Sequence, residues 1–431
     1  MIGDLHVGFG TADITPPVGV ELCGFGWYLG RKSTGVLEPL LARAMVWQTG
    51  DRRGAILSCD LVGVNRELVH AVRAALSDAC GIPAEHTMLC ATHTHSGPTT
   101  VPFIGWGEQD PDYLAGLPER IASAARIAAR QMSPATMEYG AVPVAGISFN
   151  REVRSGETDP LVRVLSVKSG DRMMGFLAHY SCHPVVMCQQ TSLISGDFVG
   201  LATNQLAAKY GAVGMFLQGS CGDQNSVYRF QPQEEALGSL RLLADRFAER
   251  IEAALEGAQP IPSDAVCVKR RELSLPQSVP DRPLLLRHWQ LAKEVMAHED
   301  LPEDLRRRFK LEQAVYQAVW QRYDRTPLGS RQTEIQAIRF GDITLVAHPA
   351  ELFYRFQRET ESRLAPAKTM VVGYANDYVG YVPSPDRFDV SEEVVSYPAL
   401  FVPFLLGEFP FRPDVGAVLT DAMVDLASAC N

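Results

Sequence analysis

The sequence predicts an α/β protein in which mixed β-sheets are flanked by helices and one helical hairpin is inserted into a single large domain. Short apolar runs alternate with helical patterns from Gly8 to about Val268, which is typical of α/β architectures. Over about 282–326 the pattern becomes purely helical and rich in Leu, Arg, Gln and Glu. No linker rich in Pro, Gly or Ser and no internal repeat is evident, so we expect residues 1–431 to form one domain.

The elements of the first part follow from the spacing of apolar residues. Continuous or alternating apolar runs predict strands over 42–47, 54–59 and 88–92, and amphipathic spacing predicts helices over 66–80 and 113–131. A strand pair over 162–167 and 174–181 is expected around the turn at 169–171, followed by a buried strand over 213–218 and a helix over 234–255.

The second part begins with two helical patterns, over 284–298 and 305–325, joined by the polar segment 299–304. We expect this hairpin to cover the α/β body, either as plain support or as a lid. The sheet then resumes with strands over 334–340, 343–347 and 371–374, a helix that begins near Pro349, and a closing helix over 415–429.

Composition and charge exclude several classes of function. The chain has 431 residues, 46% hydrophobic and 21% charged, which is ordinary for a soluble globular protein with a large core. A net charge of −10 argues against a nucleic-acid surface or a basic membrane patch. No segment approaches the 18 or so uninterrupted apolar residues of a membrane helix, so no transmembrane segment is expected. The oligomeric state is left open.

Cysteine usage and the N-terminus bear on the compartment. The nine cysteines are scattered and show no Cys-x-x-Cys spacing, which favours buried thiols in a reducing cytoplasm over a disulfide framework. Residues 1–10 lack a basic stretch followed by an apolar run, so we expect no secretory signal and a cytoplasmic location.

Two histidines stand at the end of an apolar strand pattern. His93 and His95 lie in Thr-His-Thr-His-Ser-Gly-Pro, and because strand side chains alternate in direction we expect both to project from the same face. The break at Gly97-Pro98 places them at the mouth of a sheet. Two such imidazoles can bind a divalent metal, and the alternative is a pair of partly exposed histidines without a ligand.

A second pair of histidines lies in His-Tyr-Ser-Cys-His-Pro. Pro184 forbids a helix here, so His179 and His183 are expected to share a strand face. The residue before a proline is pushed towards extended geometry, which aims His183 out of the strand end. The alternative is a core or turn histidine.

Glu351 follows His-Pro-Ala at an expected strand-to-helix junction. An acid in the first turn of a helix is favourable for electrostatic reasons alone. The carboxyl ends of strands are also where α/β proteins build their sites. His93, His183 and Glu351 would together supply the set of two histidines and one carboxylate that leaves a zinc ion an open position for water.

Two further segments contain residues that could take part in chemistry. Ser220 and Cys221, in Gly-Ser-Cys-Gly-Asp, follow a buried strand as a nucleophile would, but the sequence assigns them no base and the segment is not Gly-x-Ser-x-Gly. Residues 376–383 are rich in turn and aromatic residues and suit a substrate wall, with structural tyrosines as the alternative.

The motifs together resemble the neutral/alkaline ceramidase family. The resemblance spans Gly8 to about Pro413 and is strongest at Thr92–Pro98, and it includes Gly10–Pro17, His183-Pro184, Gly222-Asp223, Ala350-Glu351 and Asn376–Val382 in the family's order. Members are zinc amidases that cleave the N-acyl bond of ceramide. The resemblance implies a mixed α/β catalytic domain and one Zn²⁺ per chain.

Site residues are carried over from this resemblance to the matching positions. The family's zinc ligands fall on His93, His183, Glu351 and Tyr381. His95 then resembles a neighbour that contacts substrate or stabilises the oxyanion, and Arg151 resembles the family's substrate-side arginine. The resemblance also implies that Gly24 lines the pocket, and that Asp223 and Tyr397 bind substrate.

The chain departs from the family at several points. Ceramidases carry Gly-Asp-x-Ser-Pro-Asn where this chain has Gly-Asp-Gln-Asn-Ser over 222–226. We also expect no secretory signal and no C-terminal β-domain of the secreted members. These departures indicate a substrate that is not confined to ceramide.

The expected function is therefore zinc-dependent hydrolysis of linear, small-molecule or lipid-like N-acyl amides by a metal-activated water. His95, Arg151 and Tyr381 are the expected catalytic residues. The alternatives are an esterase or lactonase with the same zinc site, a metal-independent hydrolase with Cys221 or Ser220 as nucleophile, and a binding protein in which zinc is structural.

Overall fold

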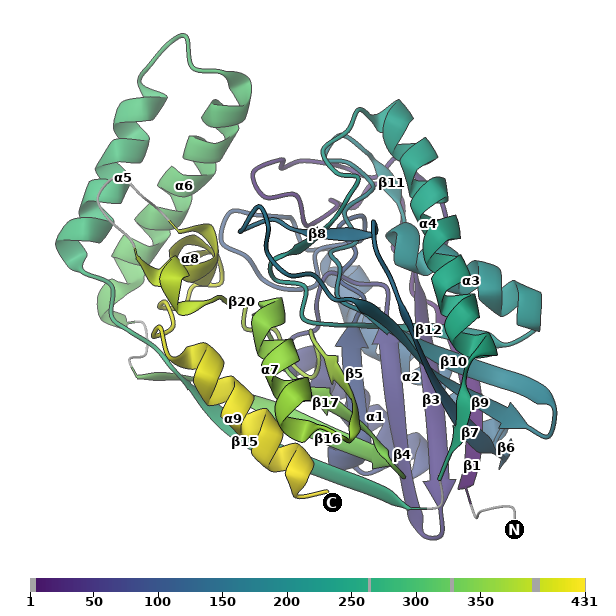
Figure 1. Ribbon diagram of the computed structural model, residues 1–431. Helices are drawn as coiled ribbons and strands as arrows, with labels where there is room; N and C mark the ends of the chain where they lie inside the picture. The colour runs from purple at the N-terminus through teal and green to yellow at the C-terminus, as the bar shows by residue number, and fades with distance from the viewer. Residues whose placement is uncertain (1–4, 263–264, 326–328, 390–395, 431) are drawn as a thin grey trace.

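The computed structural model describes residues 5–262, 265–325, 329–389 and 396–430, and over these ranges the chain stacks in four layers. Two layers of β-sheet lie face to face in the centre, with helices covering the outer face of each (Figure 1). The predicted fold class, mixed sheets flanked by helices, is confirmed.

The first sheet is built by a unit of four strands and two helices. β1, β3 and β4 are antiparallel, α1 crosses over, β5 returns parallel to β4, and α2 covers the sheet. A short edge strand, β6, closes the unit against β1. Their bounds are β1 Leu5–Asp13, β3 Leu41–Thr49, β4 Arg52–Cys59, α1 Arg66–Cys80, β5 Thr87–Ala91, α2 Pro111–Arg130 and β6 Ser133–Pro134.

The second sheet repeats this connectivity. Its first three strands are antiparallel, its fourth follows a crossover helix and is parallel to the third, and its edge strand β14 pairs with β7. The bounds are β7 Thr136–Pro143, β9 Leu161–Ser169, β10 Arg172–Tyr180, α3 Asp197–Tyr210, β12 Val213–Gln218, α4 Gln233–Glu256 and β14 Gln259–Ile261.

The third sheet has the same order again, without an edge strand among the described residues. Its bounds are β15 Val266–Pro276, β16 Ser330–Phe340, β17 Ile343–Ala347, α7 Tyr354–Leu364, β19 Lys368–Val372 and α9 Val415–Ser428. A β-β-β-α-β-α unit thus occurs three times in the described chain, although no repeat is evident in the sequence. We refer to these as units 1, 2 and 3.

Four apolar clusters hold the layers together. The central cluster joins the facing sides of all three sheets, from Phe9 and Trp47 in unit 1 to Leu177 in unit 2 and Leu345 in unit 3. Three outer clusters lie between each sheet and its own pair of helices. The sheets therefore form a rigid base, and the loops at the carboxyl ends of their strands are free to build a site.

In each unit the connection between the first and second strands is a long excursion. In unit 3 it carries the predicted hairpin, α5 (Arg282–Met296) and α6 (Glu303–Arg322), which projects from one end of the molecule (Figure 1). The hairpin packs through Leu285, Tyr316 and Val319 on Phe404 of α8 (Val402–Leu405) and its neighbours. Helices occupy 282–296 and 303–322 of the predicted insertion over about 282–326, and residue 326 lies outside the described residues.

Short strands pair around the carboxyl ends of the sheets. They are β2 Gly35–Val36 with β11 Leu193–Ile194, β8 Ser148–Asn150 with β13 Gln224–Ser226, and β18 Glu351–Leu352 with β20 Tyr381–Val382.

Two expectations about local structure are wrong. The predicted helix near Pro349 begins only at Tyr354, because the backbone N–H of Glu351 donates to the carbonyl of Gly380 and residues 351–352 form strand β18 instead. The strand before His93 ends at Ala91, and His93 has a left-handed φ of 68° rather than an extended conformation.

The cysteine prediction is confirmed in part. Seven cysteines are buried free thiols, whereas Cys267 and Cys430 form a disulfide between β15 and the residues after α9. The cytoplasmic location stays a prediction. Among the described helices none is both long and apolar enough to span a membrane.

Candidate active site

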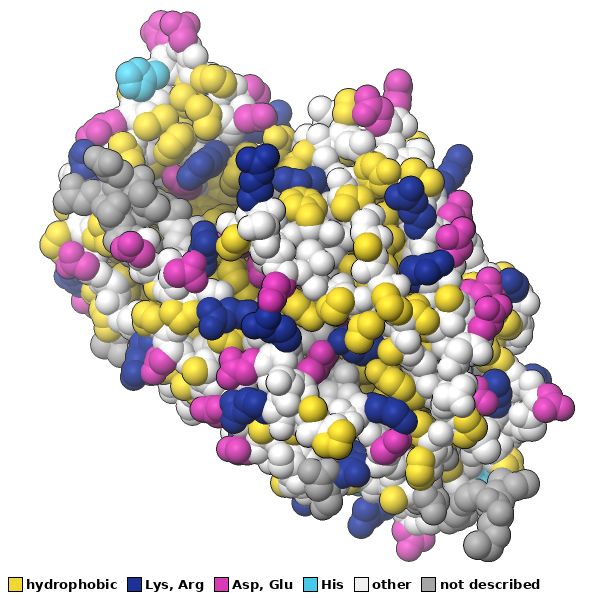
Figure 2. All heavy atoms as spheres, viewed as in Figure 1, with side chains coloured by type: hydrophobic (Ala, Val, Ile, Leu, Met, Phe, Trp, Pro, Cys, Tyr) yellow, Lys and Arg dark blue, Asp and Glu magenta, His cyan; other side chains and the backbone are white. Residues whose placement is uncertain are grey.

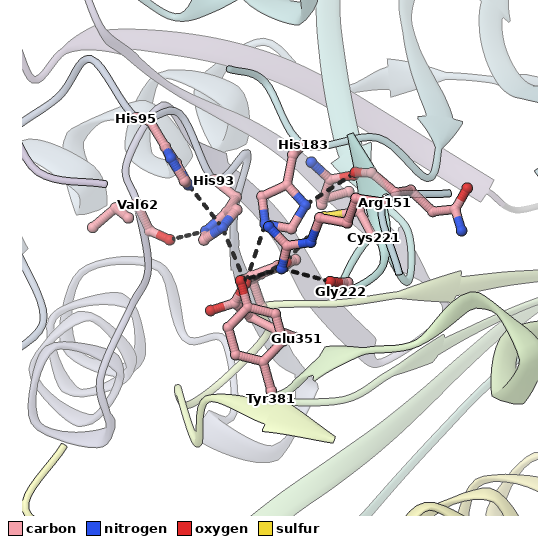
Figure 3. Close-up of polar contacts among 12 residues, drawn as sticks. Val62, His93, His95, Arg151, His183, Cys221, Gly222, Glu351 and Tyr381 are labelled. Carbon is pink, nitrogen blue, oxygen red and sulfur yellow. Dashed lines mark hydrogen bonds and ion pairs between the residues drawn. The ribbon is translucent and has the colours of Figure 1, made fainter. Parts of the chain in front are cut away.

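The strand ends of the three units meet at one buried centre. His93 comes shortly after β5 of unit 1, His183 shortly after β10 of unit 2, and Glu351 shortly after β17 of unit 3 (Figure 3). The Nε2 atoms of His93 and His183 lie 3.4 Å and 3.2 Å from the same Glu351 Oε2 atom. The three-residue set predicted from the sequence is therefore assembled in space.

Main-chain carbonyls fix the ring orientation of both histidines. The Nδ1–H of His93 donates to the carbonyl of Val62 at 2.6 Å, and the Nδ1–H of His183 donates to the carbonyl of Gln224 at 3.0 Å. The Nε2 atom of each neutral ring is then an unprotonated acceptor that points at Glu351. Metal-binding histidines are commonly held by this kind of hydrogen bond.

Gln218 at the end of β12 ties the two histidine segments together. Its side-chain amide donates to the carbonyls of Thr92 and Cys182, at 3.0 Å and 2.9 Å, and its carbonyl oxygen accepts from the backbone of Cys182. These residues immediately precede His93 and His183, so Gln218 sets the separation of the two rings. Sequence analysis did not identify it, because a buried glutamine at a strand end carries no recognisable spacing.

Glu351 is held by tyrosines as well as by the histidines. The hydroxyl of Tyr378 donates to its Oε1 atom, and the Tyr374 hydroxyl lies 3.4 Å from Oε2. Both tyrosines were missed as individual residues, although the aromatic segment 376–383 that contains Tyr378 was singled out.

The donor set fits a cation. Burial, followed by the charge of Arg151, lowers the pKa of His183 to about 4, so its ring is neutral near pH 7. When both rings are neutral, a carboxylate and two imidazole lone pairs converge, and no proton lies between these acceptors. Buried acceptors in this arrangement need a positive charge, and two histidines with one carboxylate suit zinc.

His95 belongs to the same cluster but is held differently. Its Nε2 lies 3.1 Å from the Nε2 of His93, and its buried Nδ1 has no partner among the described residues. The expectation that strand alternation places His93 and His95 on one face is wrong. The strand ends at Ala91, and the turn that follows brings the two rings together instead. A second possible donor set consists of His93, His95 and His183. Each offers one ring nitrogen, and these three nitrogens lie within 4.8 Å of one another.

Arg151 and Tyr381 lie beside the carboxylate. Arg151 Nη2 donates to the Tyr381 hydroxyl at 2.7 Å and to the carbonyl of Gly222 at 2.8 Å, while its buried Nε has no hydrogen-bond partner in the described chain. Tyr381 pairs with Glu351 in the parallel ladder of β18 and β20. Both side chains line the pocket, and the ligand role of Tyr381 stays a prediction.

The pocket over this centre has a volume of about 150 Å³. Gly24 and Tyr397 line it, and aromatic side chains form much of its wall, among them Phe25, Trp27, Phe103, Trp106, Phe230 and Tyr378. Gly24 is required sterically, because a Cβ atom there would lie 2.3 Å from Cγ of His95.

Asp223 lies outside the pocket lining. Its carboxylate accepts hydrogen bonds from the Asn150 side chain at 2.8 Å and from the backbone of Tyr354 at 2.9 Å. It therefore ties β8 to the start of α7 behind the pocket. His179 is likewise remote from the centre: it lies within β10, and its ring bonds to the carbonyl of Val371.

The geometry disfavours Ser220 and Cys221 as nucleophiles. His348 Nδ1 accepts from the backbone of Ala350, so the proton of this neutral ring lies on Nε2, which then donates to Ser220 Oγ and cannot act as its base. Burial raises the pKa of the Cys221 thiol well above its ordinary value. Both side chains are fully buried and neither lines the pocket.

Comparison with known proteins points in one direction. Residues 5–224 match the family described as neutral/alkaline non-lysosomal ceramidase, N-terminal. The chain is 25% identical over 229 residues to a neutral ceramidase of Mycobacterium tuberculosis. This alignment covers 46% of this chain and 35% of the relative. It is 28% identical over 253 residues to a neutral ceramidase of Pseudomonas aeruginosa, covering 52% and 37%.

Solved structures share the whole fold. The neutral ceramidase of Pseudomonas aeruginosa superimposes with a TM-score of 0.74 at 21% identity, over 99% of this chain and 74% of that one. A ceramidase complexed with C2 gives a TM-score of 0.75 at 20% identity, over 99% and 75%. The sequence matches span little more than a third of the curated relatives, whereas the structural match extends over nearly all of this chain.

Proposed function

Because this chain belongs to the neutral/alkaline non-lysosomal ceramidase family, we propose that it is a zinc-dependent hydrolase of linear N-acyl amides not confined to ceramide. The observation that carries the proposal is the convergence of His93 Nε2 and His183 Nε2 on Glu351 Oε2, within 3.4 Å. Three acceptors from three structural units meet there, and two of them, His93 and Glu351, line the pocket.

His93, His183 and Glu351 would hold the zinc ion, with Tyr381 beside them as the fourth candidate. We place His95 outside the ligand set, because its Nδ1 lacks the backbone acceptor that orients the rings of His93 and His183. A bound zinc supplies Lewis acidity and brings the pKa of water towards neutrality.

The remaining residues bind and orient the amide. Arg151 presents an Nε–H that makes no hydrogen bond in the described chain, and Tyr381 presents a hydroxyl; both suit the negative charge that develops on the amide oxygen. His95 Nδ1 has no hydrogen-bond partner in the described chain, so it can take the proton that the attacking water gives up and pass it to the leaving amine. The aromatic wall excludes water and packs against the apolar part of the substrate.

The test is metal content and amidase activity in protein purified without added metal. We expect about one zinc per chain, with turnover of N-acyl amides lost to a chelator and restored by zinc. His93→Ala and Glu351→Ala should lose both metal and turnover, whereas His95→Gln should keep the metal and lose turnover. His70→Gln, an exposed histidine on α1, is the matched control and should change neither.

Several outcomes would contradict the proposal. Full turnover in metal-free Glu351→Ala would remove the metal from the reaction. Loss of metal in His95→Gln would move His95 into the ligand set. Equal hydrolysis of matched esters and amides would favour an esterase or lactonase at the same site, and zinc retained without any turnover would favour a structural role for the metal.

A further inference from the structure

A second cavity adjoins the candidate active site beneath the helical hairpin. It has a volume of about 350 Å³ and lies between α6 and the loop that follows Gly24. Its walls include Trp27, Leu29 and Leu311 together with Arg306, Arg307 and Lys310. Trp27 also lines the inner pocket, so the two cavities are neighbours on either side of one indole ring. We call this second cavity the outer groove.

The inner pocket is too small for a long substrate. A cavity of about 150 Å³ holds a group of roughly benzene size. Any substrate larger than such a group therefore extends beyond the inner pocket, and the outer groove offers it a place past Trp27.

The outer groove is basic in an otherwise acidic protein. The whole chain carries a net charge of −10, yet three cations and one carboxylate, Glu303, line this groove. Figure 2 shows Lys and Arg side chains between the hairpin and the body. This placement favours an anionic occupant.

The basic side chains are not neutralised within the described chain. Lys310 is exposed and has no ion pair there, and the Arg306 guanidinium bonds only to the carbonyls of His298 and Glu299. Arg307 pairs with Glu303 through Nε at 2.9 Å, which leaves its terminal nitrogens available. Two of the three positive charges thus have no carboxylate partner.

The repeated units give an independent reason to assign the hairpin to substrate binding. The connection between the first and second strands carries Gly24 and Trp27 in unit 1 and Arg151 in unit 2, and these residues line the inner pocket. The hairpin is the same connection in unit 3. It is attached to the loop of unit 1 through the Arg308 guanidinium, which lies 5.7 Å from the Trp27 ring.

We propose that the outer groove binds an anionic group of the substrate, a carboxylate or a phosphate, that is joined to the scissile amide by a linker long enough to pass Trp27. The substrate is then an N-acyl amide with a compact apolar or aromatic group in the inner pocket and an anionic end between Arg306 and Lys310. This inference rests on the proposed amidase function.

The test compares two amides that differ only in their far end. One is N-benzoyl-6-aminohexanoate, and the other is its neutral carboxamide. We expect the carboxylate to have a kcat/KM about tenfold higher, mainly through KM, and this preference to shrink in high salt. In the Arg306→Gln/Lys310→Gln double variant the ratio of the two kcat/KM values should fall to about one. Arg287→Gln on α5, an exposed arginine that does not line the groove, should keep the ratio.

A phosphate-ended amide of the same length distinguishes the two anions by its kcat/KM. Binding of the sulfonamide counterparts, which are not hydrolysed, is measured by calorimetry on the protein as purified. One outcome separates the two proposals: neither amide is hydrolysed, but the anionic sulfonamide binds about tenfold tighter than the neutral one and loses this advantage in the double variant. The anionic subsite would then stand, and the proposed amidase function would be wrong. Equal kcat/KM and equal binding for charged and neutral ends, or a preference that survives in the double variant, would overturn the anionic subsite.

Discussion

His93 and His183 are prepared for their role by backbone carbonyls rather than by other side chains. Val62 and Gln224 accept from Nδ1 of the two rings, and this leaves both Nε2 atoms as acceptors towards Glu351. Backbone groups are positioned by the fold itself, so the tautomers do not depend on the protonation of a further residue. The site is therefore preorganised for a cation before one is bound.

The contact between Gly24 and His95 gives a first prediction. Gly24→Ala places a Cβ atom 2.3 Å from Cγ of His95, so the ring must move, and we expect turnover to fall about a hundredfold with the metal retained. The control is Gly26→Ala in the same loop, which also has a positive φ, 56°, but has open space at the Cβ position. Kinetics and metal analysis of both variants make the comparison. Similar losses in both would show that backbone strain, and not the displacement of His95, is responsible.

Sequence analysis found the three residues that converge at the centre, but not the way they are held. The chain breaks at Gly97 and Pro184 marked His93 and His183 as strand-end imidazoles, and the combination with Glu351 made them candidates. Tyr374 and Gln218 carry no such mark. Their contacts, with Glu351 and Thr92, join residues 23 and 126 positions apart, which local spacing does not encode.

At the scale of elements, the spacing of apolar residues predicted strands and helices well where the segment showed only the helix period or only the strand pattern. Helix α1 and strand β17 have the bounds that were predicted. The error at Glu351 arose where a local preference competed with a distant partner: the first-turn position favoured a helix, and the pairing of β18 with β20 prevailed.

A buried ion pair between elements of different units gives the second prediction. Arg73 of α1 binds Glu334 of β16 through two hydrogen bonds, 2.6 Å and 3.0 Å, and both side chains are about 3% exposed or less. Glu334→Ala leaves the guanidinium buried without its carboxylate, and we expect the free energy of unfolding to fall by about 3–5 kcal/mol. Urea denaturation measures the loss.

Glu272 provides the control for this pair. It stands directly opposite Glu334 in the ladder of β15 and β16, but its side chain is 51% exposed. Glu272→Ala should cost less than about 1 kcal/mol. Equal losses for the two variants would mean that the buried pair between units 1 and 3 contributes no more than a surface pair does.

The connection before β3 gives a third prediction, on pH. Glu38 accepts hydrogen bonds from Ser195 Oγ and from the backbone of Gly196, and burial, with Asp197 and Asp60 nearby, raises its pKa to about 8. The unfolded state releases this proton near pH 4.5, whereas the folded state holds it up to about pH 8. The contribution of Glu38 to stability therefore falls as the pH rises from about 4.5 to about 8.

Glu38→Gln isolates that contribution. The Tm of the wild type should fall, relative to that of the variant, from about pH 5 to about pH 8. Asp197 has a pKa raised to about 6 by burial and acts with the same sign, but it is present in both proteins and cancels in the difference. A Tm difference that is flat over this range would contradict the raised pKa of Glu38.

At the scale of the whole molecule, three units of one design meet at the site, and each contributes a donor. Ion pairs and hydrogen bonds across the seams include Arg73 with Glu334, Arg163 with Glu361, and Arg43 with Asn204. This architecture could not be predicted, since apolar spacing identifies a strand but not its partner, and the three units share no evident sequence pattern. The fold class could be predicted because β and α periods alternate along the chain.

The disulfide gives the last prediction and follows from the same repeat. In units 1 and 2 the edge strands β6 and β14, which follow the last helix, pair with the first strand and close the sheet. In unit 3 the residue in this position is Cys430, after α9, and it is bonded to Cys267 on the first strand β15. The disulfide therefore does for unit 3 what the edge strand does for the other two.

Because the bond spans 163 residues, the chain-entropy argument gives it a stabilising contribution of up to about 5 kcal/mol. Reduction, or Cys430→Ser, should lower the Tm and make α9 and β15 exchange amide protons faster, while β5 and β12 beneath the candidate active site keep their protection. Cys80→Ser removes a free thiol on α1 and serves as the control, whose Tm should still fall when reductant is added. If reduction leaves the wild-type Tm unchanged, the packing of α9 on the third sheet alone closes this unit, and the disulfide has no share in its stability.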